Sequence, residues 1–92
     1  ISMNKELTEN LIGNSSKKAN KFRLILHNDE VNTFDHVIAS LEEVCFYSHE
    51  QAEQCALITH YKGRYDIKSG SYTTLQPYKN GLSARSLTVT IE

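Results

Sequence analysis

Apolar and polar residues alternate over residues 21–27, and this period of two predicts a β-strand. From Phe34 onward the apolar residues recur at steps of three and four, which predicts an amphipathic helix ending near Phe46 or Tyr47. We place the N-cap of this helix at Asn32, because an Asn side chain can accept a hydrogen bond from a free amide of the first turn. The strand is thus followed directly by a helix.

A second helix is predicted from Ser48 to Gly63. Ser48 is a good N-cap with Gln51 three residues on, and Gly commonly follows the last turn of a helix. The apolar stripe of this helix consists mostly of small residues, which indicates close approach to a neighbouring element. Its members are Ala52, Cys55, Ala56 and Thr59.

The last third of the chain is predicted to return to the sheet. Residues 64–72 form a second strand candidate, and apolar residues alternate with threonines over residues 87–91 in a final strand. Between them, Pro77 and Gly81 restrict residues 73–85 to at most a short helix. This order predicts an α+β sandwich, in which a largely antiparallel three-stranded sheet packs against two to three helices.

Length and charge narrow the class of protein. Ninety-two residues correspond to one small domain, and ten basic against eleven acidic residues argue against a nucleic-acid or membrane partner. No apolar run reaches the length of a membrane span or a signal-peptide core. Cys45 and Cys55 are interpreted as free buried thiols of a reducing compartment. We therefore predict a cytoplasmic protein. We separately expect it to be a monomer.

Residues 1–20 are polar and are predicted to form a flexible arm ahead of a single domain at residues 21–92. An inert terminus and a functional tether are alternative interpretations of this arm. Ile1 and Ser2 precede Met3, so one interpretation is that they are a remnant of recombinant expression and that Met3 is the natural start.

Three side chains that carry oxygen lie where the first strand meets the first helix: Asn28, Asp29 and Glu30. The second helix is expected to return His60 to the same end of the molecule. An amide, carboxylates and an imidazole can converge on a small cation, which leaves a metal ion and an ammonium group as alternatives. Another interpretation of His60 is that it only caps carbonyls at the helix end.

Three hypotheses can be compared for this corner: a metal site, a catalytic site and a binding site for a peptide amine. A metal site would need ligand spacing such as HExxH, CxxC or a calcium loop, and the sequence has none of these, so we expect neither metal nor cofactor. Catalysis with His60 as a base and Asp29 as its orienter would lack a nucleophile nearby, so we do not expect an enzyme. A peptide α-amine fits best, because it is largely protonated at neutral pH, with a pKa of about 8.

The chain resembles the ClpS family of protease adaptors in two segments, which read LILHNDEVNTFDHVIASLEEV and ITHYKGR. That family has an N-D-D corner, here residues 28–30, and a helix ending in V-H-Y-x-G-[KR], here residues 59–64. Residues 87–92 resemble its closing strand. The resemblance covers about residues 21–92 and implies a ClpS-like fold, which is related to that of a ribosomal protein's C-terminal domain.

The resemblance implies an adaptor that binds N-degron proteins, those with Leu, Phe, Tyr or Trp as first residue. It would deliver them to a Clp-type AAA+ unfoldase of ClpA or ClpC type. Asn28 and His60 would hold the α-amino group, with Asp29 and Glu30 supplying acceptor charge and Asn32 binding the peptide backbone at the rim. The side-chain pocket would be walled by Leu26, Phe34, Val37, Ala56, Thr59 and Leu87.

This chain departs from the family pattern at several of these positions. The family usually has Asp at Glu30, Met at Phe34 and Ala56, and Val at Thr59. A rigid ring at Phe34 is expected to narrow or reshape the pocket, which leaves the preference among Leu, Phe, Tyr and Trp open. The alternative function is a small α+β interaction module without specificity for N-terminal residues, and a third is a ribosomal-protein-like domain.

Overall fold

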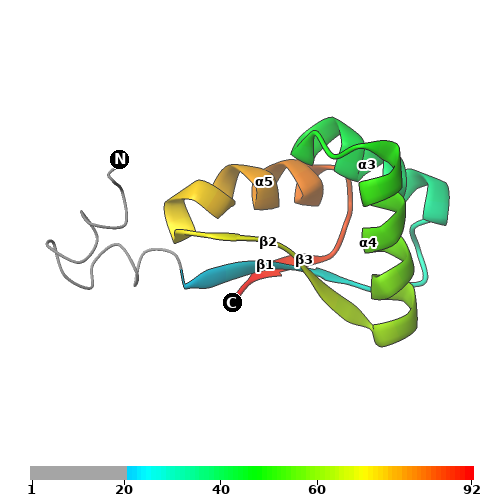
Figure 1. The fold of residues 1–92 in the computed structure, drawn as a ribbon, viewed down its shortest axis with the longest axis horizontal. Coiled ribbons are helices and arrows are strands. Elements are labelled where there is room, and N and C mark those ends of the chain that lie inside the picture. Colours follow the sequence, from blue (N-terminus) through cyan, green and yellow to red (C-terminus); the bar gives the residue numbers. More distant parts are fainter. Residues whose placement is uncertain (1–20) are drawn as a thin grey trace, which may run out of the picture.

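Within residues 21–92, a three-stranded antiparallel sheet forms one layer and three helices gather on one side of it (Figure 1). This computed structural model describes residues 21–92, so the arm predicted at residues 1–20 lies outside the described residues. The predicted α+β architecture and order of elements are confirmed. The elements are β1 (Phe22–His27), α3 (Phe34–Cys45), α4 (His49–Lys62), β2 (Arg64–Gly70), α5 (Tyr72–Ala84) and β3 (Val89–Ile91).

The central strand of the sheet is β1, which pairs antiparallel with β2 on one side and β3 on the other. Its register with β2 shifts at one point, where Leu24 faces Lys68 but Ile25 faces Asp66. The ladder continues one step past the strand, since the backbone N–H of Asn28 donates to the carbonyl of Gly63 over 2.9 Å. The end of β1, where the predicted corner begins, is therefore held in place by Gly63, the residue between α4 and β2.

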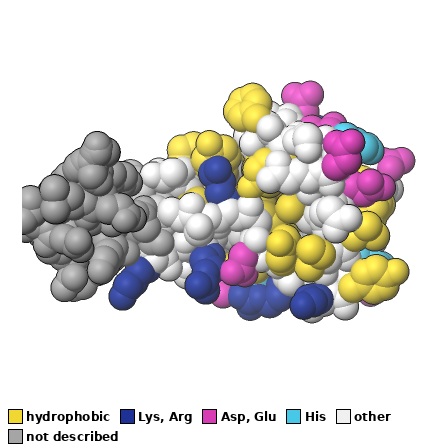
Figure 2. Space-filling model, in the orientation of Figure 1, with side chains coloured by type: hydrophobic (Ala, Val, Ile, Leu, Met, Phe, Trp, Pro, Cys, Tyr) yellow, Lys and Arg dark blue, Asp and Glu magenta, His cyan; other side chains and the backbone are white. Residues whose placement is uncertain are grey.

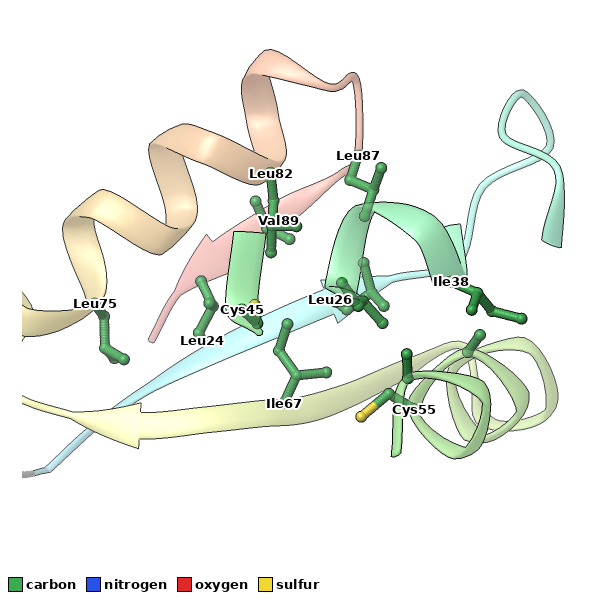
Figure 3. Close-up of a cluster of buried hydrophobic side chains, with 13 residues drawn as sticks. Leu24, Leu26, Ile38, Cys45, Cys55, Ile67, Leu75, Leu82, Leu87 and Val89 are labelled. Atoms are coloured by element: carbon green, nitrogen blue, oxygen red, sulfur yellow. The ribbon is translucent and has the colours of Figure 1, made fainter. Parts of the chain in front are cut away.

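The core lies between the helices and the sheet, and every element contributes to it (Figure 3). Leu24 and Leu26 project from β1 toward the helices and are at most 2% exposed. Burying one such side chain stabilises the fold by roughly 1.5–3 kcal/mol. The other labelled core residues are Ile38, Cys45, Cys55, Ile67, Leu75, Leu82, Leu87 and Val89.

The prediction for residues 73–85 is wrong, because α5 is a continuous helix of thirteen residues that contains both Pro77 and Gly81. Pro77 removes one backbone donor in the second turn, a penalty that tertiary packing can outweigh. The packing is visible at Leu75 and Leu82, which lie on either side of Pro77 and are both fully buried.

The predicted N-cap of α3 is also wrong by one residue. Thr33 caps the helix, since its Oγ1 accepts a hydrogen bond from the backbone N–H of His36 over 3.1 Å. The amide nitrogen of Asn32 instead donates to the carboxylate of Asp29 and to the carbonyl of Ser86. Ser48 and Gly63 bound α4 as predicted.

Both cysteines are free and buried, as the sequence predicts. Burial raises the pKa of the Cys45 thiol to about 11 and also raises that of Cys55. Within residues 21–92, no helix combines the length and apolar character needed to cross a membrane.

Candidate functional site

A cavity of about 230 Å³ opens where the end of β1 meets α3, the end of α4 and the segment before β3. Its lining combines apolar side chains with six polar ones, three of which come from the loop after β1. The apolar lining residues are Leu26, Phe34, Val37, Ala56 and Leu87, and the polar ones are His27, Asn28, Asp29, Asn32, Thr59 and His60.

The structure brings together around this cavity every residue named from the sequence except Glu30. The Glu30 side chain is exposed and does not line the cavity. Sequence reasoning missed His27, which strand alternation assigns to the face opposite Leu26. Its ring Nε2 lies 2.8 Å from Oγ1 of Thr90 on β3. Its position directly before Asn28, at the end of the strand, was the available signal.

Asn28 and His60 line the same cavity because backbone hydrogen bonds tie the end of β1 to the end of α4. Gly63 adopts a left-handed conformation, with a φ of 91°, and its N–H caps α4 by donating to Thr59 at 2.8 Å. Its carbonyl in turn accepts the N–H of Asn28. The helix end is thus closed by Gly63 rather than by the ring of His60. Within residues 21–92 neither the Asn28 nor the His60 side chain forms a hydrogen bond, so both are available to a ligand.

Asp29 has a different role, because its carboxylate is fully engaged within the chain. Oδ1 accepts the backbone N–H groups of Val31 and Asn32, both at 2.9 Å. Oδ2 accepts Nδ2 of Asn32 at 2.9 Å and the hydroxyl of Thr88 at 3.2 Å. A carboxylate has about four acceptor positions, so these bonds fill them. Asp29 therefore orders the loop and supplies negative charge rather than a free acceptor.

The protonation of Asp29 reflects the same contacts. Partial burial raises its pKa, but the hydrogen bonds from Asn32, Val31 and Thr88 outweigh that effect, and the net pKa lies below the ordinary value of 3.8. Donors directed at a carboxylate stabilise its charged form. The side chain is consequently ionised at neutral pH and keeps a negative charge beside the cavity.

Asn32 connects this loop to the far wall of the cavity. Its Nδ2 donates to the carbonyl of Ser86 over 2.8 Å as well as to Asp29. Ser86 precedes Leu87, which is 5% exposed and lines the cavity. The position of the wall formed by Leu87 thus depends on a side chain of the loop.

The apolar walls are mostly closed to solvent. Leu26, Ala56, Thr59 and Leu87 are each at most 5% exposed. The hydroxyl of Thr59 donates to the carbonyl of Cys55 at 2.8 Å, so its hydrogen is already used inside α4. Phe34, by contrast, is 38% exposed, which is consistent with a position at the mouth. The cavity can therefore enclose an apolar side chain that enters past Phe34.

The charge around the site favours a cationic ligand. Residues 29–53, which include the loop, α3 and the first part of α4, contain seven acidic residues and no Lys or Arg. Figure 2 shows acidic side chains gathered over the helices and basic ones along the sheet side of the visible face. Within residues 21–92, no three His, Cys, Asp or Glu side chains lie close enough together to hold a metal ion.

Comparison with known proteins adds independent information. The family model described as "ATP-dependent Clp protease adaptor protein ClpS" matches residues 17–90. The ATP-dependent Clp protease adapter protein ClpS of Oleidesulfovibrio alaskensis is 38% identical over 53 residues, which cover 58% of this chain and 51% of that protein. This chain therefore spans about half the length of that curated relative.

A solved structure shares the fold. It is the structure of Agrobacterium tumefaciens ClpS2 bound to L-phenylalaninamide, which superposes with a TM-score of 0.68 over 80% of this chain and 96% of that chain, at 14% identity. The family match covers most of the sequence, and the fold agrees with it. The chain belongs to the ClpS family of ATP-dependent Clp protease adaptor proteins.

Proposed function

We propose that this protein is a non-enzymatic adaptor that binds the bulky hydrophobic first residue of N-degron substrates and delivers them to a Clp-type AAA+ unfoldase of ClpA or ClpC type. One observation carries the proposal. An open cavity with mostly buried apolar walls borders two polar side chains, Asn28 and His60, that have no hydrogen-bond partner within residues 21–92. An N-terminal residue has the matching chemistry, since it joins an apolar side chain to an ammonium group.

The ammonium group allows the site to distinguish an N-terminal residue from an internal one. The Asn28 carbonyl oxygen and a neutral ring nitrogen of His60 are both acceptors, and Asp29 adds negative charge nearby. An internal residue has an amide in place of the ammonium and would leave these acceptors without a donor. Asn28 and His60 are exposed in the free protein, and a ligand that covers them without supplying a donor leaves each unpaired at a cost of about 1–3 kcal/mol, which disfavours internal sequences.

The side chain of the ligand's first residue contributes binding free energy, and its shape determines which residues the cavity accepts. Enclosing a Leu or Phe side chain contributes roughly 2–3 kcal/mol. The rigid ring of Phe34 at the mouth disfavours side chains branched at the β-carbon, such as Val. The proposal is supported by family membership and by the phenylalanine derivative bound to the Agrobacterium tumefaciens relative.

The test is a titration with peptides that begin with Leu, Phe or Val, each with a free and an acetylated amine. Free Leu and Phe peptides should bind, and acetylation should weaken binding at least about tenfold because two acceptors lose their donor. Equal binding of free and acetylated peptides would contradict the proposal and favour an interaction module without N-terminal specificity.

Delivery needs a separate experiment, because ligand binding alone does not establish it. A Phe-initiated reporter is incubated with a ClpA- or ClpC-type unfoldase and its peptidase, with and without this protein. We expect faster degradation of the Phe-initiated reporter and no change for one that begins with Val. The Asn28→Ala variant should remove the acceleration, and acceleration that survives this change would contradict the link between the cavity and delivery.

A further inference from the structure

Three side chains join α3 to the connection between α5 and β3. The ring Nε2 of His36 lies 2.8 Å from the main-chain carbonyl of Arg85, and Nε of Arg85 donates to Oγ of Ser40 over 2.9 Å. The Ser40 hydroxyl donates in turn to the carbonyl of His36 over 2.7 Å. These three residues form a closed set of hydrogen bonds, which we call the polar clamp. Arg85 is thus held by α3 twice, through its main chain and through its side chain.

The direction of each bond in the polar clamp follows from its partners. A carbonyl can only accept, so Nε2 of His36 must carry a hydrogen. The one hydrogen of the Ser40 hydroxyl is used on His36, so its oxygen accepts from Arg85. Ser40 is 0% exposed, and a buried polar group is costly when a partner is removed. The polar clamp therefore fixes a distance and an angle, which apolar contacts alone do not.

The clamp holds more than Arg85, because the end of α5 and Leu87 form one unit. The backbone N–H groups of Arg85 and Leu87 both donate to the carbonyl of Leu82, each over 3.0 Å. Between them, Ser86 adopts a left-handed conformation with a φ of 72°, which reverses the chain tightly. A shift of Arg85 relative to α3 would consequently carry Leu87 with it.

Leu87 and α3 form facing parts of the cavity lining. Leu87 lines the cavity from the segment before β3, and Phe34 and Val37 line it from the start of α3. His36 lies between those two residues in the sequence, so the helix that carries one wall also carries part of the clamp. No clamp residue lines the cavity itself. The clamp can therefore act on a ligand only by setting how far Leu87 lies from α3.

We propose that the polar clamp of His36, Ser40 and Arg85 holds the Leu87 wall at a fixed distance from α3 and so makes the cavity reject first residues that branch at the β-carbon. This inference rests on the proposed function. The three residues are positioning residues, since they act through Leu87. The rigid ring of Phe34 can exclude a branched side chain only if the opposite wall does not yield. A cavity of variable width would lose this discrimination before it loses all affinity.

The experiment uses two peptides whose first residues are isomers. Leu and Ile have the same atoms, but only Ile is branched at the β-carbon. Leu-Ala and Ile-Ala peptides are titrated against the full chain and against His36→Phe and Ser40→Ala, each of which cuts a different bond of the clamp. We expect wild type to bind the Leu peptide at least about tenfold more tightly, and this ratio to fall about threefold or more in each variant.

Tyr47→Phe is the control for a general loss of stability. The Tyr47 hydroxyl donates to the carbonyl of Ile67 beyond the C-terminal end of α3, and neither residue lines the cavity. This variant should lower the midpoint of urea denaturation, as the clamp variants do, but it should keep the wild-type ratio of the two peptides.

A second measurement reports on the clamp in the free protein. Because Nε2 of His36 donates to a main-chain carbonyl, its proton should be sheltered from exchange with water and give a resolved resonance at neutral pH. Ser40→Ala should broaden that resonance, since it releases the side chain of Arg85, whereas Tyr47→Phe should leave it unchanged.

The outcomes separate the inference from the proposed function. If wild type binds the Leu peptide but both clamp variants keep its preference over Ile, the inference is overturned and the proposed function stands. The same holds if wild type binds both peptides equally, if Tyr47→Phe lowers the ratio as much as the clamp variants do, or if the His36 proton is not sheltered. If a clamp variant does not fold, the other variant and the wild-type resonance decide. If neither peptide binds wild type, the proposed function fails together with the inference.

Discussion

Gly81 on α5 lies directly against Val44 on α3: a β-carbon added at Gly81 would be 2.8 Å from Cγ1 of Val44. Such a distance is too short for two carbon atoms, and the β-branched Val44 has little freedom to move away. The absence of a side chain at Gly81 is therefore what allows the two helices to approach each other.

From this contact we predict the effect of Gly81→Ala. At an unhindered helix position Ala is more stable than Gly by about 1 kcal/mol. Overpacking here should reverse the sign and lower the free energy of unfolding by about 1 kcal/mol, as measured by urea denaturation. The matched control is the double variant with Val44→Ala, which should recover part of the loss. An increase in stability on Gly81→Ala alone would show that the contact is not tight.

Phe46, which ends α3, should be replaceable with a gain in stability. It adopts a left-handed conformation, with a φ of 59°, although its side chain is 82% exposed. This conformation costs a non-glycine residue roughly 1–2 kcal/mol, and the exposed ring contributes little packing in return. We expect Phe46→Gly to raise the free energy of unfolding by about 1 kcal/mol.

Phe46→Ala is the control for that measurement. It removes the same ring but keeps a β-carbon in the left-handed conformation, so it should not increase stability. Equal stabilisation by Ala and Gly would mean that loss of the exposed ring, and not relief of the backbone, is responsible.

Because the pKa of Asp29 is lowered in the folded protein, we predict that the protein loses stability in acid. Its pKa in the folded protein is below 3.8, so ionisation stabilises the fold above that value, and the contribution is lost as the pH falls through the folded pKa. The difference in unfolding free energy between wild type and Asp29→Asn should therefore be constant near neutral pH and narrow in acid. Denaturation curves between about pH 6 and about pH 2 measure it. A difference that does not change over this range would contradict the assigned contacts.

Most of the helices and strands could be predicted because their positions depend on interactions between residues that are close in the sequence. The alternation of residues 21–27, the three-and-four spacing from Phe34 and the caps at Ser48 and Gly63 each act within one element. The length of α5 could not be predicted in this way. Pro77 and Gly81 are unfavourable within a helix, and what compensates for them is burial against partners distant in the sequence.

The candidate site also depends partly on local sequence and partly on contacts between residues that are distant in the sequence. Most residues that line the cavity could be predicted from the sequence. The hydrogen bonds that give Asp29 and Asn32 different roles could not. Asp29 reaches Thr88, which is 59 positions away, and Asn32 reaches Ser86 across 54 positions. The bond from Thr88 completes a set of four donors to Asp29 of which the other three are local, and the bond to Ser86 ties the Asn32 amide nitrogen to a distant segment. The N-cap of α3 is Thr33 rather than Asn32 because both residue types are good caps, and local pattern does not separate two neighbouring candidates.

The most direct test of the central claim is a measurement of intermolecular nuclear Overhauser effects between a Phe-initiated peptide and the labelled protein. We predict contacts from the ring of the first residue to methyl groups of Leu26, Val37, Ala56 and Leu87, together with a shift of the His60 ring resonances. Binding accompanied by contacts only to groups outside the cavity, with these methyl groups unaffected, would contradict the account.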